Sequence, residues 1–363
     1  MTRVPLARPS LADREHHYVL EALEASWLSG HGPHVERFEQ GWSSCCGTRH
    51  AVAVASGTAA LHLLLVALGV RAGDEVIVPA LTYVAVANAV RHAGGIPVVA
   101  DVDPATWCLS TVAARAAVTR RTVGVVAVHA YGHPADVGAL SALAARHGLW
   151  LVEDGAEAHL ATYHGAVVGG LARAAVFSFF ANKIVSTGEG GAVTTSDTAL
   201  AERVRALSRQ GVAEGDDRYS PSLTGLGLRM GNLAAAVGCG QLERLGELLD
   251  RRRHVWRRYQ QGLGQSSAVR AQPVRGCVTV APWLYSVTFD EGARRDAVRR
   301  ALTVNGIESR PLFPNLATLP VAAPASDRCP EAGRLAACGL SLPLYPDLQS
   351  SDVDRIVEVV GGA

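Results

Sequence analysis

The sequence contains almost no lysine. Lysine and arginine together number 34 in the 363 residues, but Lys183 is the single lysine and all the other positions are arginine. A compositional drift from lysine to arginine that spared one position suggests that arginine cannot replace lysine there. A guanidinium stays protonated, whereas a primary amine can lose its proton and attack a carbonyl group. We therefore favour a catalytic Lys183 that forms an imine over a surface lysine that survived by chance.

Other absences argue against whole classes of protein. No apolar run is long enough to span a bilayer, and residues 1–10 (MTRVPLARPS) lack the apolar centre of a signal peptide, so we expect a cytoplasmic protein. The formal net charge is only +1, which gives no electrostatic reason to bind nucleic acid or an anionic membrane. The sequence has no GxxxxGK or GxGxxG motif, which argues against a site for a nucleoside triphosphate or a dinucleotide.

Cysteine and histidine show no pattern typical of a bound metal. The seven cysteines are odd in number and form no CxxC motif, and the 13 histidines show no HExxH or paired-ligand spacing. We therefore expect reduced, buried thiols and no metal site.

Alternating apolar segments predict the fold. Short continuous apolar runs, typical of parallel strands buried on both faces, alternate with helical segments from residue 50 onward. We expect strands at residues 51–54, 75–79, 96–100, 123–128, 149–154, 174–179 and 191–195. The fold class is thus α/β, with a large, mostly parallel sheet covered by helices in residues 1–245 and a smaller α+β domain in residues 246–363. One long helix is expected over residues 233–263, with Arg251, Arg252 and Arg253 on a solvated face.

The surroundings of Lys183 favour a reactive amine. Phe177, Phe179 and Phe180 precede it, and a glycine-rich turn at residues 188–191 follows. An apolar setting that removes water lowers the pKa of a lysine towards neutrality.

Two further groups lie at strand ends or helix starts, where open α/β sheets form their ligand crevice. Ser56, Gly57 and Thr58 precede an apolar helix, and free N–H groups, a small glycine and two hydroxyls there would form a phosphate cradle. An ordinary helix N-cap is the alternative. Asp154 closes the strand LWLVED and could meet a cationic heterocycle, although it could also be a turn residue.

Three more residues could complete such a site. Glu157 could reach the same ring, Tyr83 could stack on its face, and Ser178 could add a hydroxyl to the phosphate. For Glu157 the alternative is a solvent-facing helix charge, and for Tyr83 it is a half-buried core side chain. A unique lysine, a strand-end aspartate and a phosphate cradle together match pyridoxal phosphate, which needs an ionised acid at its ring nitrogen to act as an electron sink.

Long segments of the chain resemble a known family. The DegT-type nucleotide-sugar aminotransferases contain, in the same order, segments similar to SGTAALHLLLVALGVRAGDEVIVPALTYVAVANAV, VEDGAEAHLA, FSFFANKIVSTGEGGAV, LRMGNLAAAVGCGQLERL, GIESRP and GLSLPLYP. This resemblance implies the type I fold of pyridoxal phosphate enzymes. Among the subfamilies, the chain looks most similar to enzymes like GDP-perosamine synthase, which aminate C4 of a 4-keto-6-deoxy sugar.

The resemblance also implies roles for individual residues. Lys183 would carry the cofactor covalently, and Asp154 would pair with the ring nitrogen. The other cofactor contacts implied are Gly57, Thr58, Ala59 (through its backbone), Tyr83, Glu157, Ser178 and Arg229. Glu189 and Arg310 are expected to contact the substrate. Enzymes of this family are usually dimers with shared active sites, so a homodimer is expected.

Two positions depart from the family pattern. The family usually has an asparagine two residues before the arginine that corresponds to Arg229, and this chain has Gly227 there. The perosamine-type enzymes usually carry a histidine in the loop after GIESRP, where the aligned residue here is Ala317. The first departure bears on how the cofactor phosphate is bound, and the second on which sugar is used.

The predicted function is therefore amino transfer from an amino acid, with L-glutamate as the expected donor, to a keto sugar such as a nucleotide-linked 4-keto-6-deoxyhexose. One alternative is an aminotransferase acting on a keto-cyclitol or another antibiotic precursor. Another is a partner or regulator that binds pyridoxal phosphate without turnover. A sugar dehydratase of the same fold would usually have histidine in place of Lys183.

Overall fold

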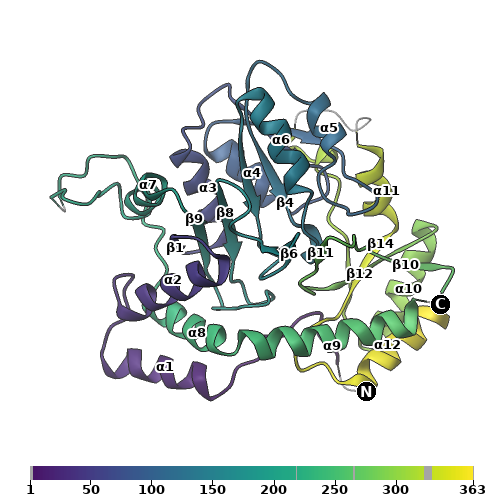
Figure 1. The fold of residues 1–363 in the computed structure, drawn as a ribbon. Coiled ribbons are helices and arrows are strands. Elements are labelled where there is room, and N and C mark those ends of the chain that lie inside the picture. Colours follow the sequence, from purple (N-terminus) through teal and green to yellow (C-terminus); the bar gives the residue numbers. More distant parts are fainter. Residues whose placement is uncertain (1–2, 218, 265, 323–328, 363) are drawn as a thin grey trace.

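A seven-stranded sheet forms the centre of the larger part of the protein (Figure 1). The structure is a computed structural model that describes residues 3–217, 219–264, 266–322 and 329–362. The strand order is β1-β9-β8-β5-β4-β2-β3. β9 is antiparallel to both of its neighbours, β1 and β8. The other four pairings of the described sheet are parallel: β2 with β3, β2 with β4, β4 with β5 and β5 with β8. The strands are β1 (His50–Val54), β2 (Glu75–Pro79), β3 (Ile96–Ala100), β4 (Thr122–Val128), β5 (Trp150–Asp154), β8 (Ala174–Ser178) and β9 (Gly191–Thr195).

Helices cover both faces of this sheet, because the strands are apolar on both faces. In β5, Leu151 packs into one apolar cluster and the next residue, Val152, packs into another on the opposite face. The helices of this part are α1 (Asp13–Glu24), α2 (Pro33–Cys46), α3 (Gly57–Ala67), α4 (Ala85–His92), α5 (Thr111–Ala116), α6 (Val137–His147), α7 (Thr198–Ser208) and α8 (Asn232–Glu243), with a 3-10 turn η1 (Ala130–Gly132). This arrangement confirms the predicted α/β class with a mostly parallel sheet.

A smaller antiparallel sheet, of order β10-β12-β14-β13, lies to the right of the large sheet in Figure 1. Its elements are β10 (Val269–Ala271), β12 (Tyr285–Phe289), α10 (Gly292–Val304), β13 (Arg310–Pro311), η2 (Leu316–Thr318), α11 (Pro330–Cys338), β14 (Gly339–Leu342) and α12 (Ser350–Gly362). A third sheet joins β11 (Val278–Thr279) to β6 (Thr162–Tyr163) and β7 (Ala166–Val167). The predicted division of the chain at residue 245 stays a prediction.

The helix predicted over residues 233–263 is wrong as a single element. It is divided at Arg244 into α8 and α9 (Leu245–Leu263), because Arg244 leaves helical geometry with φ −103° and ψ 7°. The Arg244 side chain turns back to the carboxylate of Glu15, at 3.0 Å. α9 then continues beneath both sheets (Figure 1).

The prediction that all three arginines of the run 251–253 lie on a solvated face is wrong for Arg252. Arg251 and Arg253 make ion pairs at the surface, with Asp347 and Asp250. Arg252 lies on the buried stripe of α9 and is only 1% exposed.

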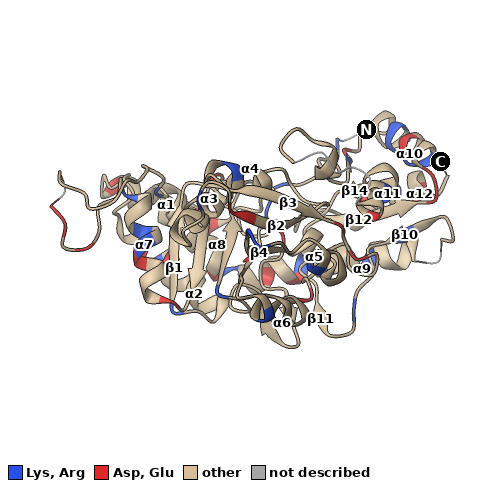
Figure 2. Cartoon of the chain, turned by 90° about the horizontal axis from the view of Figure 1, so that it is seen from above, with Lys and Arg blue, Asp and Glu red and all other residues tan. Residues whose placement is uncertain are grey.

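Basic and acidic residues are spread over both parts of the molecule (Figure 2). No helix in the described part of the chain is long and apolar enough to cross a membrane.

Candidate active site

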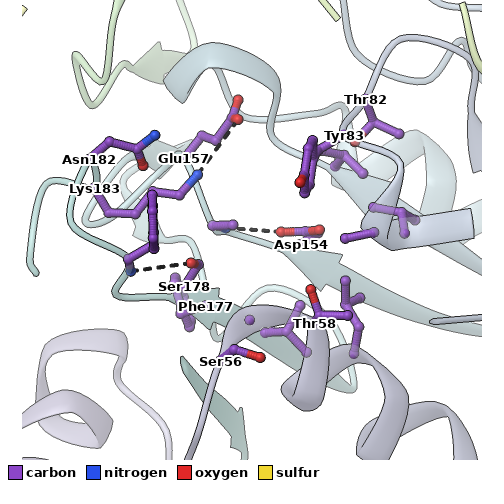
Figure 3. Close-up of a pocket in the computed structure, with 18 of the residues that line it drawn as sticks. Ser56, Thr58, Thr82, Tyr83, Asp154, Glu157, Phe177, Ser178, Asn182 and Lys183 are labelled. Atoms are coloured by element: carbon purple, nitrogen blue, oxygen red, sulfur yellow. Dashed lines mark hydrogen bonds and ion pairs between the residues drawn. The ribbon is translucent and has the colours of Figure 1, made fainter. Parts of the chain in front are cut away.

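A cavity of about 400 Å³ lies at the carboxyl ends of β4, β5 and β8 (Figure 3). The start of α3 and the segment before α4 form one side of it, and the connection between β8 and β9 forms another. Its lining includes Ser56, Gly57, Thr58, Thr82, Tyr83, Asp154, Glu157, Ser178, Phe180, Asn182, Lys183, Glu189, Trp283, Arg310 and Phe313.

Lys183 lies in the connection between β8 and β9, which the backbone holds in shape. Phe179 donates a hydrogen bond to the carbonyl of Gly190, and Thr187 donates one to the carbonyl of Phe179, both at 2.8 Å. The N–H of Lys183 itself donates to the carbonyl of Phe180 at 2.9 Å. These bonds close the loop on itself and direct the lysine side chain into the cavity.

The Lys183 amine has two close neighbours. Its Nζ is 3.8 Å from Oε1 of Glu157 and 4.2 Å from the centroid of the Trp283 ring. Burial lowers the pKa of Lys183 below its usual value, and the carboxylates of Glu157 and Asp154 oppose this shift in part. The setting therefore favours a neutral, nucleophilic amine more than a surface position would.

Glu157 is held by an unusual turn. Its Oε2 accepts a hydrogen bond of 2.8 Å from the backbone N–H of Tyr131. Tyr131 has φ 55°, a left-handed conformation that costs energy for a residue with a Cβ. Burial raises the pKa of the Glu157 carboxyl, while Lys183 and the Tyr131 N–H lower it.

Asp154 is the last residue of β5 and is buried. One oxygen, Oδ1, accepts a hydrogen bond of 3.0 Å from the N–H of Ala156. Burial raises the pKa of Asp154, and neither the Ala156 N–H nor Lys183 compensates for it fully. A protonated ring nitrogen would supply the missing positive charge to this carboxylate.

The start of α3 forms a close-fitting turn against two strands. Ser56 caps the helix by accepting a hydrogen bond from the N–H of Ala59 at 3.1 Å. A Cβ on Gly57 would lie 2.8 Å from Cβ of Ser178, and a Cβ on Gly191 would lie 2.4 Å from the carbonyl carbon of Ser56. Glycine at both positions lets the helix start approach the cavity, where its N–H groups can meet an anion.

Arg310 lies over an aromatic cluster. Its guanidinium carbon is 5.0 Å from the Trp283 ring centroid and 5.2 Å from that of Phe313. Nε and Nη2 of Arg310 are buried and have no hydrogen-bond partner within the described residues. Buried donors of this kind normally have partners, so they favour an anionic ligand in the cavity.

Comparison with known proteins assigns the family. Residues 9–361 match the DegT/DnrJ/EryC1/StrS aminotransferase family. The chain belongs to this family. It is 41% identical to the GDP-perosamine synthase of Caulobacter vibrioides over 361 residues, covering 98% of this chain and 97% of that protein.

Solved aminotransferases have the same fold. The aminotransferase TlmJ of Streptoalloteichus hindustanus superposes with a TM-score of 0.93 and 33% identity, covering 99% of this chain and 98% of that one. Spr1654 of Streptococcus pneumoniae, in its PLP form, superposes with a TM-score of 0.94 and 26% identity, covering 99% and 98%. The predicted family and the predicted fold are therefore confirmed.

Most of the predicted site residues lie together in this aminotransferase. Nine of them line the cavity: Gly57, Thr58, Tyr83, Asp154, Glu157, Ser178, Lys183, Glu189 and Arg310. Ala59 lies one helical position beyond the lining, and its N–H already bonds to Ser56. Arg229 is exposed, lies outside the lining and places its Nη1 3.1 Å from Nε2 of His31. The roles predicted for all eleven residues stay predictions.

The two positions that depart from the family pattern also lie outside the cavity lining. Gly227 is exposed and pairs with Arg209 in an isolated bridge. Ala317 is buried in η2, where its N–H donates to the side chain of Asn315.

Among the cavity residues that sequence reasoning missed, those with polar or aromatic side chains are Thr82, Asn182, Trp283 and Phe313. Thr82 and Asn182 are the immediate neighbours of predicted residues, so adjacency could have suggested them. Trp283 and Phe313 come from the second part of the chain, 100 and 130 residues beyond Lys183, and no local pattern marks them.

The residues present fit pyridoxal phosphate. The helix start can hold the phosphate, Asp154 can hold a cationic ring nitrogen, and Lys183 supplies the primary amine. The unpartnered donors of Arg310 and the buried, unpartnered Oδ1 of Asn182 leave polar groups for a substrate beside it.

Proposed function

We propose that this protein is a pyridoxal phosphate-dependent aminotransferase that moves an amino group from an amino acid to a keto sugar. The observation that carries the proposal is the position of the only lysine, whose buried amine lies in the cavity beside Glu157 and near the buried Asp154. The family, which is an aminotransferase family over residues 9–361, supports the same chemistry.

Pyridoxal phosphate, when bound, supplies an electron sink for proton transfer at the carbon that carries the amino group. The chain's own residues bind it and move the proton. Thr58 and Ser178 would bind the phosphate together with the α3 start, Tyr83 would lie on the ring face, and Asp154 would keep the ring nitrogen protonated.

Lys183 would act as the base and acid. Its lowered pKa leaves a larger neutral fraction at working pH, so Nζ can take the proton from the donor carbon and return it to the neighbouring carbon. Glu157, at 3.8 Å, would orient this amine. A positioned base of this kind contributes about 10²–10⁴-fold to such a transfer.

The amino donor is proposed to be L-glutamate. Arg310 would bind its α-carboxylate, because the unpartnered Nε and Nη2 lie among apolar rings where a charge-assisted hydrogen bond is strong. The acceptor is proposed to be a nucleotide-linked 4-keto-6-deoxyhexose, since a GDP-perosamine synthase is 41% identical over nearly the whole chain. Glu189, which is exposed and lines the cavity, would contact the sugar.

We also propose that the protein is a homodimer. Leu20 and Leu23 on α1, and Trp27 in the segment after it, are large apolar residues that are 56%, 48% and 47% exposed. Exposed apolar side chains gathered in one region fit a protein interface better than free solvent. Action in the cytoplasm stays a prediction from the sequence.

Absorbance of the bound cofactor tests the function. We expect a yellow protein that bleaches when L-glutamate is added and regains its colour when a GDP-linked 4-keto-6-deoxyhexose follows. A panel of keto sugars and keto-cyclitols then identifies the acceptor, and recovery with a keto-cyclitol alone would favour the antibiotic-precursor alternative. A yellow protein that no amino acid bleaches would instead be a binding partner or regulator and would contradict the proposal.

A further inference from the structure

Arg252, the middle arginine of the run Arg251–Arg253, binds the backbone of the proposed catalytic lysine. The buried stripe of α9 comprises Leu245, Leu248, Leu249, Arg252, Val255, Tyr259 and Leu263, so Arg252 occupies a position of the helix that otherwise holds apolar or aromatic side chains. A leucine or methionine there would continue the stripe, and a buried cation is costly unless it is compensated. Its presence therefore needs a specific explanation.

Four backbone carbonyls surround the Arg252 guanidinium. Nη1 donates to the carbonyls of Trp283, Leu344 and Pro282 at 3.1, 3.2 and 3.4 Å. Nη2 donates to the carbonyl of Lys183 at 3.2 Å. No ion pair to a carboxylate accompanies these bonds within the described residues, and burial alone lowers the pKa of Arg252 to about 9.

The same guanidinium thus holds two segments that meet at the lysine amine. Trp283 has its carbonyl bound by Arg252, and its indole Nε1 donates to the carbonyl of Asn182 at 2.8 Å. The Trp283 ring in turn lies 4.2 Å from Nζ of Lys183. Arg252 therefore holds Lys183 in two ways. It binds the backbone carbonyl of Lys183 directly, and it binds the backbone of Trp283, whose ring packs against the Lys183 amine.

We propose that Arg252 is a positioning residue that sets where the Lys183 amine lies in the active site. It reaches neither the substrate nor the cofactor, and it acts through the carbonyls of Lys183 and Trp283. Without it, the Lys183 segment and Trp283 are no longer tied to α9, and the amine leaves its place over the indole and near Glu157. The inference rests on the proposed function, but its effect on the amine exists in the cofactor-free protein as well.

The single lysine permits a direct test. Reductive methylation of the cofactor-free protein with ¹³C-formaldehyde labels one side chain, Lys183, besides the chain's amino terminus, and the dimethylated amine can still gain and lose a proton. Because Nζ lies over the Trp283 ring, we expect an upfield-shifted NMR signal that titrates below the usual lysine range. Trp283→Leu, which removes the indole, gives the reference chemical shift of the labelled amine without the effect of the ring.

In Arg252→Met we expect the upfield shift to shrink towards that of Trp283→Leu and the pKa of the labelled amine to rise towards its ordinary value. In the assay of the proposed reaction, kcat should fall about 10–100-fold, since a displacement of about 1 Å can cost this much. Arg253→Met, which removes the neighbouring surface arginine, is the matched control and should leave the signal and kcat unchanged.

Arg252→Gln, which keeps two N–H donors, is the second variant in case the methionine variant does not fold. It should give an intermediate signal. Thermal unfolding separates the alternatives. If Arg252→Met or Arg252→Gln is less stable but keeps the wild-type shift and titration, Arg252 only supports the fold and the inference is wrong. Since these signals need no turnover, that result is distinct from a failure of the proposed aminotransferase activity.

Discussion

The proposed chemistry depends on Lys183, so its substitution is the sharpest test at the scale of single residues. Lys183→Arg keeps a positive charge but removes the primary amine, so we expect turnover to fall at least about 10²–10⁴-fold. Borohydride reduction of the wild type followed by peptide mapping should place the cofactor on Lys183. Arg253→Lys adds a surface lysine as a control that should stay unlabelled. Activity retained in Lys183→Arg would refute the assignment.

Asp154 gives a prediction about pH. Burial raises the pKa of the Asp154 carboxyl in the folded protein. The protonated carboxyl therefore contributes its full share to the free energy of unfolding below the unfolded-state pKa of about 3.9. This contribution is lost as the pH rises through the higher pKa of the folded state. At pH 7 the cofactor-free Asp154→Asn protein should therefore melt at a higher temperature than the wild type, and the difference should shrink as pH falls towards 4. Bound pyridoxal phosphate should reverse the order, because its ring nitrogen partners the carboxylate.

Asp197 is the matched control for this pH dependence. It caps α7 by accepting the Leu200 N–H at 3.1 Å, and that bond lowers its pKa. Its stabilisation is present above the unfolded pKa, so Asp197→Asn should be less stable than the wild type at pH 7, with the loss fading in acid. Equal melting temperatures for cofactor-free Asp154→Asn and wild type at pH 7 would contradict the prediction, because they would mean that the ionised Asp154 carboxylate does not destabilise the folded protein.

The sequence predicts those residues of the site that lie in local patterns, and it does not predict those that are brought in from distant parts of the chain. Three residues stand in local sequence patterns: Lys183 precedes a glycine-rich turn, Asp154 ends a strand and Gly57 starts a helix. Their positions in the cavity could therefore be predicted. Trp283 and Arg252 carry no such signal, because their importance comes from contacts between distant segments. The spacing of α9 could still have warned against a solvated Arg252, since it falls three positions after Leu249 on the apolar stripe.

At the scale of elements, the fit between the start of α3 and β9 is a feature that the sequence pattern did not reveal. A Cβ on Gly191 would lie 2.4 Å from both the carbonyl carbon and the oxygen of Ser56, and backbone atoms cannot turn away as a flexible side chain can. Gly191→Ala should therefore lower the free energy of unfolding by about 1–3 kcal/mol. It should also weaken the binding of pyridoxal phosphate, because the phosphate cradle is displaced.

Gly246 offers the matched control. It lies in the first turn of α9, and a Cβ there would meet nothing within 4 Å. Gly246→Ala should raise the free energy of unfolding by roughly 0.5 kcal/mol and leave cofactor affinity unchanged. Urea unfolding and fluorescence titration with pyridoxal phosphate measure both quantities. A Gly191→Ala protein as stable as the wild type would show that this turn adapts without strain.

At the scale of the whole molecule, the proposed homodimer would explain both the open side of the cavity and the position of Arg229. Tyr83 and Phe180, which line the cavity, are 60% and 44% exposed. Arg229 is exposed beside His31, close to the apolar segment that ends α1, because Asn232 binds the carbonyls of Trp27 and Leu28. A second subunit on this surface would cover the apolar segment and receive Arg229.

The last prediction is that Arg229 acts in the active site of the partner subunit, where its guanidinium can bind phosphate oxygens of the cofactor or the substrate. Gly227 has no amide side chain to do this, which leaves Arg229 as the polar side chain of that segment. Lys183→Ala and Arg229→Ala should each be inactive alone. After subunit exchange, a mixed dimer contains one site with a wild-type lysine and a wild-type Arg229 from the other subunit, so part of the activity should return. If Arg229 served its own subunit, every mixed site would lack one of the two residues. A mixture that stays inactive, with exchange verified by mass and Arg229→Ala inactive alone, would refute action across the interface.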